Sequence, residues 1–194
     1  IFSPSAIDLG PALQGFIIAL VFFGFLPLGY HFLIHGGSAE QFGLIRGNAR
    51  RGTLESIAAA VLLFVFTVAV YKIFPVIGSS YELPLKVTES FSWFLVYELA
   101  IVPSTLILFE IFFRGFVQQS WLSDRLGWFS VLAQGILFIV FLFATQSLAL
   151  STLHLVLLAF VAGFLVHRTR SLWYALATGW LYLLLLDVYF LIIR

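Results

Sequence analysis

Long runs of apolar residues, separated by short polar stretches, form the main pattern of this chain. A transmembrane helix needs about 20 mainly apolar residues to cross about 30 Å of hydrocarbon. Six runs fit that requirement, at residues 12–34, 54–74, 91–113, 128–146, 148–166 and 172–193. The sequence therefore predicts an all-α, polytopic membrane helix bundle of about six transmembrane helices, in a single integral membrane domain over residues 1–194.

The composition agrees with this pattern and excludes several classes of function. Hydrophobic residues make up 62% of the chain and charged residues 10%, whereas soluble domains contain about 45–50% apolar and about 25% charged residues. The formal net charge of +1 excludes the basic footprint of a nucleic-acid-binding protein. Because the chain has no cysteine, disulfides, thiol nucleophiles and cysteine metal sites are excluded too.

The positions of lysine and arginine predict which loops face the cytoplasm. The first apolar run lacks a charged leader and a small-residue cleavage site, so we expect a true span rather than a signal peptide. We expect a multi-pass protein of a bacterial inner (cytoplasmic) membrane, with loops 1, 3 and 5 cytoplasmic and both termini outside. The basic residues of those three loops are Arg46, Arg50, Arg51, Arg114, Arg125, Arg168 and Arg170, against Lys72, Lys86 and Arg194 on the opposite side.

Ionisable residues inside the third span are candidates for a site, because each costs at least about 2.5–3.5 kcal/mol to insert at a helix centre. Glu110 and Arg114 are four residues apart, so they share a helix face and can pair. The pair is either a structural ion pair or an active site or its remnant. Glu98 lies about 120° round the helix from Glu110, which excludes an acid/base dyad on one face and favours a contact with another helix. Pro103 predicts a kink that frees a backbone carbonyl, which Ser104, Thr105 or a water could satisfy.

A stripe of small and polar residues in the fifth span predicts close helix packing. Ser147, Ser151 and His154 share one face, which continues through Ala159 to Gly163. His154 is open to two interpretations: a buried neutral imidazole bonded to a neighbouring helix, or an axial ligand to a tetrapyrrole or a metal. No metal site is predicted, because His154 has no second ligand.

Three other ionisable groups are expected to contact water. Asp187 lies towards the end of the last span, where we expect it near the outer interface. His31 and His35 flank the end of the first span, where a wet environment requires no special function.

Three segments in register resemble the CAAX protease and bacteriocin-processing family of intramembrane enzymes. Glu110–Gly115 resembles the end of the family's Glu-Glu-x-x-x-Arg motif. Phe42–Leu44, followed by the basic Arg46–Arg51 stretch, resembles the start of the family's second span. Arg168–Trp173 is similar to the family's Arg-Thr-Gly-Ser-Leu-Trp segment before its last conserved helix.

The resemblance implies a catalytic set that this sequence lacks. In active members the first glutamate is the general base, a histidine in a Phe-x-x-x-His motif helps to hold the attacking water, and a histidine and an asparagine stabilise the oxyanion. Of the glutamate motif, only Glu110 and Arg114 remain, as remnant candidates, and His154 is at no family position. The residues at the four catalytic positions are Phe109, Leu142, Gly179 and Leu183.

These replacements favour a non-catalytic membrane protein over a peptidase. An oxyanion donor contributes about 10²–10³ in rate and a general base about 10²–10⁴. The first hypothesis is therefore an accessory or assembly subunit that binds other integral membrane proteins, with aromatic side chains (18% of residues) as contacts. Two alternatives stay open: an intramembrane glutamate-type endopeptidase with an unconventional site at Glu110, and a pigment- or tetrapyrrole-binding subunit that uses His154.

Overall fold

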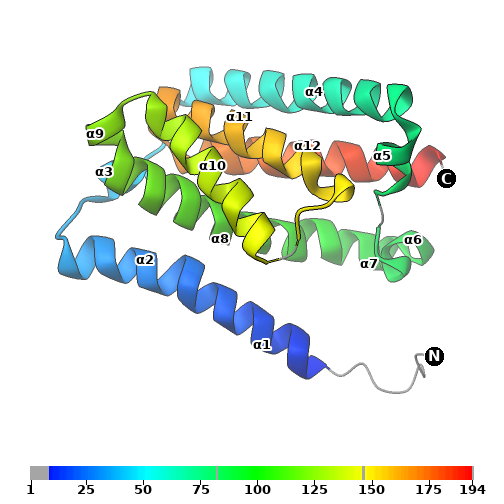
Figure 1. The fold of residues 1–194 in the computed structure, drawn as a ribbon, viewed down its shortest axis with the longest axis horizontal. Helices are drawn as coiled ribbons and strands as arrows, with labels where there is room; N and C mark the ends of the chain where they lie inside the picture. The colour runs from blue at the N-terminus through cyan, green and yellow to red at the C-terminus, as the bar shows by residue number, and fades with distance from the viewer. Residues whose placement is uncertain (1–8, 82, 146, 194) are drawn as a thin grey trace.

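In a computed structural model, residues 9–81, 83–145 and 147–193 are described, and within these ranges all regular structure is helical (Figure 1). Five helices there have the length and composition to cross a membrane: Gln14–Ile34, Ala49–Ile73, Phe91–Leu126, Leu150–Thr169 and Leu172–Ile193. The remaining apolar helix, Phe129–Ala144, is shorter, at 16 residues. The predicted all-α polytopic membrane bundle is confirmed, with one helix of the predicted six falling below spanning length.

Several spans are assembled from consecutive helical segments. The first half of the chain contains α1 (Leu9–Ala19), η1 (Leu20–Phe25), α2 (Leu26–Gly29), η2 (Tyr30–Ile34), α3 (Ala39–Phe42), α4 (Ala49–Ile73), α5 (Pro75–Ser79) and α6 (Leu85–Glu89). The second half contains α7 (Phe91–Val96), η3 (Tyr97–Ile101), α8 (Val102–Phe109), η4 (Glu110–Leu122), α9 (Ser123–Leu126), α10 (Phe129–Ala144), η5 (Leu150–Thr152), α11 (Leu153–Thr169) and α12 (Leu172–Ile193).

The helices form a bundle with the first span and α4 on opposite faces (Figure 1). The first span packs against the third span, and α4 packs against α11 and α12. The third span, α10, α11 and α12 lie between those two faces. The turns at α3 and α9 are at one end of the bundle, and α5, α6 and α7 are at the other (Figure 1).

A small-residue stripe joins α4 to α12. The Ser56 hydroxyl donates to the Tyr174 carbonyl at 3.0 Å, and the Thr67 and Tyr182 hydroxyls are 2.9 Å apart. A Cβ at Gly52 would lie 2.3 Å from the Tyr174 ring, so only glycine permits this approach. These buried positions recur every three or four residues along α4, which is the spacing that lets membrane helices pack closely.

The predicted packing stripe on α11 is confirmed in part. Ala159 and Gly163 are buried, whereas Ser147 lies before the helix and is exposed. Two glutamines from neighbouring helices bond to carbonyls of this stripe: Gln134 donates to Ala159 at 2.9 Å and Gln118 to Gly163 at 2.7 Å. The small side chains therefore expose backbone carbonyls to interhelical hydrogen bonds.

The third span contains a π-helical turn, η3, directly before Pro103. In a π-helix the amide of residue i+5 donates to the carbonyl of residue i, and Val102 donates to Tyr97 in this pattern. The next carbonyl, that of Glu98, would be served by residue 103, but proline has no N–H. The Trp180 indole of α12 donates to the Glu98 carbonyl instead, at 2.8 Å. The predicted free carbonyl is thus satisfied by another helix.

The expected wet environment of His31 is wrong. The residue is 1% exposed, and its ring Nδ1 lies 2.8 Å from the Ser120 hydroxyl and its Nε2 3.0 Å from the Ser38 carbonyl. The chain after the first span folds back over this ring, since a Cβ at Gly37 would lie 2.2 Å from it. His35 is exposed, as expected.

Candidate functional site

The three segments that carry the family resemblance meet at one end of the bundle. The Leu172 amide donates to the Gly43 carbonyl at 2.8 Å, and the Trp173 indole donates to the Leu44 carbonyl at the same distance. Phe42 is fully buried against Gly115, where an added Cβ would lie 2.3 Å from the ring. These contacts fix the register of the third and last spans. The register in turn determines which side chains face the space between these two spans.

A cavity of about 370 Å³ lies between the third span, α10, α11 and α12. Tyr81, from the connection between α5 and α6, also lines it. Most of its wall is apolar, and its ionisable side chains are Glu110, Arg114, His154 and Asp187 together with two tyrosines. The complete wall consists of Tyr81, Tyr97, Ile101, Val102, Thr105, Leu106, Phe109, Glu110, Arg114, Phe138, Leu142, Ser151, Thr152, His154, Leu155, Leu158, Leu183 and Asp187.

The predicted pair of Glu110 and Arg114 is confirmed. A guanidinium nitrogen lies 3.4 Å from one carboxylate oxygen, and the two residues are 5% and 3% exposed. Arg114 also donates to the Ala159 carbonyl at 3.3 Å. The second Glu110 oxygen and Arg114 Nε have no hydrogen-bond partner among the described residues. Glu110, the carboxylate that is a candidate catalytic group, is therefore paired with Arg114 of the same helix.

A second polar group occupies another part of the cavity, where α11, α12 and the α5–α6 connection meet. The Tyr81 hydroxyl donates to the Asp187 carboxylate. The His154 ring lies 5.3 Å from the Tyr81 ring and 6.3 Å from the Tyr182 ring, measured between centroids. The carboxyl group of Glu98 lies next to that of Asp187.

The expectation that Asp187 reaches water is wrong. Asp187 is 1% exposed because Tyr81 folds over it from the connection before the third span. Burial raises the pKa of the Tyr81 phenol well above its ordinary value, and the neighbouring Asp187 charge raises it further. Tyr81 therefore remains a hydrogen-bond donor to this carboxylate at any ordinary pH.

One comparison with known proteins gives a result. Residues 91–185 match the family model described as type II CAAX prenyl endopeptidase Rce1-like. These residues belong to the Rce1-like family. No curated protein and no solved structure matches the chain. The Rce1-like region contains the whole wall of the cavity apart from Tyr81 and Asp187, which lie before and after it.

Within the Rce1-like region, the positions that the resemblance assigns to catalysis gather at the cavity. Phe109, Leu142 and Leu183 line it directly. Gly179 lies just behind the wall, since an added Cβ would be 3.3 Å from Leu106 and 3.7 Å from Leu158. Sequence reasoning predicted that apolar groups replace the catalytic set; the side chains of Phe109, Leu142 and Leu183 line one cavity, and Gly179 lies behind its wall.

Aromatic packing fills the side of the cavity where the family's general base is expected. The Phe109 ring lies 5.8 Å from Phe138 and 5.8 Å from Phe141 on α10. Phe23 of the first span is also 5.8 Å from Phe109 and makes an edge contact with Phe112 at 4.8 Å. Edge and tilted contacts of this kind add about 0.5–1.5 kcal/mol each beyond area burial. The ring at position 109 therefore stabilises helix packing, and it offers no proton acceptor.

Sequence reasoning missed Tyr81 and the glutamines Gln118 and Gln134. A signal existed for Gln118, because it continues the four-residue spacing of Glu110 and Arg114 along one helix. No sequence signal places Tyr81 over Asp187, since that contact joins residues 106 positions apart. Among the described residues, no three histidine, cysteine, aspartate or glutamate side chains gather as a metal site would require. The tetrapyrrole site at His154 stays a prediction.

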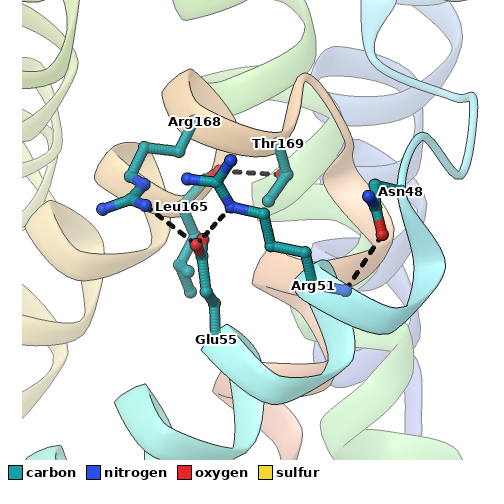
Figure 2. Close-up of polar contacts among 6 residues, drawn as sticks. All are labelled: Asn48, Arg51, Glu55, Leu165, Arg168 and Thr169. Atoms are coloured by element: carbon teal, nitrogen blue, oxygen red, sulfur yellow. Dashed lines mark hydrogen bonds and ion pairs between the residues drawn. The ribbon is translucent and has the colours of Figure 1, made fainter.

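Charged residues at the start of α4 and the end of α11 meet at one end of the bundle (Figure 2). Glu55 accepts from Arg51 at 2.8 Å and from Arg168 at 2.9 Å. Arg170 joins loop 5 to the end of the third span, donating to Ser123 at 2.7 Å. These contacts bring the ends of loops 1, 3 and 5 together at one end of the bundle. Which side is cytoplasmic stays a prediction.

Proposed function

We propose that this Rce1-like membrane protein is non-catalytic and acts as an accessory or assembly subunit that binds other integral membrane proteins. The observation that carries the proposal is the apolar lining at Phe109, Leu142 and Leu183. Hydrolysis requires a base to activate water and donors aimed at the developing negative charge. At these positions the chain has groups that neither accept nor donate protons.

The short helix α10 supports a protein partner. Its 16 residues rise about 24 Å at 1.5 Å per residue, which is less than the roughly 30 Å of hydrocarbon. A helix of this length thins the bilayer or associates with another protein. An apolar groove of about 250 Å³ runs beside it, lined by Trp128, Val131, Leu132, Phe160, Val161 and Phe164. The proposed occupant is a transmembrane helix of the partner.

Native mass spectrometry after gentle detergent extraction tests this proposal. The expected result is a discrete complex with at least one other membrane chain. Leu132→Trp fills the groove and should release the partner, whereas Leu62→Trp on the exposed face of α4 should not. A lone monomer from native membranes, or equal complex formation by both variants, contradicts the proposal.

One observation favours a second candidate, a peptidase that uses Glu110. Glu110 and His154 come from different helices and line the same cavity, which places a carboxylate and an imidazole on one shared space. This candidate predicts cleavage of a membrane-inserted or prenylated peptide that disappears with Glu110→Gln and survives Glu55→Gln. Absence of turnover by the folded protein across a broad peptide panel rejects it.

A further inference from the structure

Two carboxyl groups interact in the buried interior of the helix bundle without a cation. Asp187 on α12 and Glu98 on the third span are each 1% exposed, and they interact with one another. Among the described residues neither forms an ion pair with a lysine or arginine. Adjacent buried carboxyl groups need a shared proton or an external positive charge.

Hydrogen-bond acceptors exceed donors around this carboxyl pair. Tyr81 donates to Asp187, but both Glu98 oxygens lack a hydrogen-bond partner among the described residues. His154 is nine-tenths buried and part of the cavity wall, and its Nδ1 has no hydrogen-bond partner within the described part of the chain. Buried polar atoms are normally satisfied. A ligand that brings N–H donors would supply what this part of the protein lacks.

The other charges of the cavity do not neutralise the carboxyl pair. Arg114 is the only lysine or arginine in the described wall, and it is bound to Glu110. Counted together, the wall contains two carboxyl groups, those of Glu110 and Asp187, and one guanidinium; Glu98 interacts with Asp187 but is not part of the wall.

The rest of the cavity suits an aliphatic chain. From the polar group, the wall continues through Leu155 and Leu158 to Phe138 and Leu142. The volume of about 370 Å³ corresponds to roughly a dozen water-sized groups at about 30 Å³ each. An amine with about ten carbons has that size.

We propose that this cavity binds a lipophilic amine, with its ammonium group at the Asp187 carboxylate, its N–H donors directed to these oxygens and to His154, and its chain along the apolar wall. The site uses Tyr81 and Asp187, which lie outside the Rce1-like region, and acceptors at no catalytic position of the family. The amine site is independent of the accessory role proposed above, so an experiment that rejects one of the two proposals does not reject the other.

Equilibrium binding of radiolabelled decylamine to the protein in nanodiscs tests this site, with empty nanodiscs subtracted. The expected result is one saturable site. Decanol and decanoate, which match the chain but lack the ammonium, should compete at least tenfold more weakly. Butylamine, which has the ammonium but a short chain, should also compete at least tenfold more weakly, which separates a membrane-derived amphiphile from a small soluble amine.

Asp187→Asn should weaken decylamine binding at least tenfold, while Glu40→Gln, an exposed acidic residue of α3, should leave it unchanged. If Asp187→Asn does not fold, Leu142→Phe is the variant to test. Its larger side chain fills space along the apolar wall, so it should reduce decylamine binding at least tenfold. Equal affinity of decanol and decylamine would overturn the proposal. So would affinity within twofold of wild type for a folded Asp187→Asn or Leu142→Phe variant.

Discussion

Replacing Glu110 by glutamine should destabilise the protein far more than an equivalent change at its surface. The substitution removes the carboxylate that lies 3.4 Å from Arg114 and leaves a guanidinium that is 3% exposed. Its remaining hydrogen bond, to the Ala159 carbonyl at 3.3 Å, is long and does not neutralise the charge. An unpaired charge in a medium of low dielectric constant carries a large desolvation penalty.

The size of the effect follows from measurements on buried pairs. Removing one partner of a buried salt bridge costs about 3–5 kcal/mol, whereas replacing both partners by apolar residues of similar volume is neutral or stabilising. For a chain of this length, 1 kcal/mol changes Tm by about 2–4 °C. We therefore expect Glu110→Gln to lower Tm by roughly 6–20 °C. The double variant Glu110→Leu, Arg114→Met should melt at or above the wild-type temperature.

Thermal unfolding in one fixed detergent, followed by intrinsic fluorescence, measures these differences. Glu55→Gln is the matched control, because Glu55 pairs with Arg51 and Arg168 at the exposed end of the bundle. Exposed ion pairs contribute about 0–1 kcal/mol, so this control should shift Tm by only a few degrees. The reasoning is refuted if Glu110→Gln melts within 2 °C of wild type. It is also refuted if the double variant melts below the single one.

Three further predictions concern contacts outside this pair. Gly115→Ala places a methyl group 2.3 Å from the Phe42 ring, and thermal unfolding should show a loss of about 1–3 kcal/mol from overpacking. Trp180→Phe removes the donor to the Glu98 carbonyl, and denaturant titration should show a loss of about 1–3 kcal/mol because that carbonyl becomes unsatisfied. The raised pKa of Tyr81 means that only the unfolded state loses this proton as pH rises above about 10. Wild-type stability should therefore fall with pH there more steeply than that of Tyr81→Phe, as measured by unfolding at several pH values.

Periodicity and composition predict the membrane bundle because every backbone N–H and C=O in hydrocarbon must be hydrogen-bonded within the protein, and few structures other than helices achieve this. The last predicted span, 172–193, has the bounds of α12, and the second and fifth differ from theirs by a few residues. The third was predicted to end at 113 but continues to Leu126. Polar residues such as Gln118 and Gln119 interrupt the apolar run there, yet they remain helical because each bonds to a carbonyl of α11. A hydropathy pattern contains no information about those tertiary partners.

The candidate site was predictable where it depends on spacing within one helix, and not where it depends on contacts between distant segments. The pair of Glu110 and Arg114 followed from their four-residue separation. The burial of Asp187 did not follow, because it depends on how the α5–α6 connection places Tyr81 over it. A residue near the end of a span is exposed or buried according to the loop above it, and the loop's path is set by tertiary packing.

The two polar groups of the cavity differ in whether the protein itself satisfies them. Glu110 and Arg114 neutralise one another and require no ligand, so their retention is explained by the cost of losing either. Glu98 and Asp187 have no such partner among the described residues, although each carries an insertion cost of at least about 2.5 kcal/mol. Apolar residues at both positions would remove that cost and pack as well. The carboxyl pair, rather than the glutamate–arginine pair at the family's motif, is therefore the group that needs either a shared proton or an external positive charge.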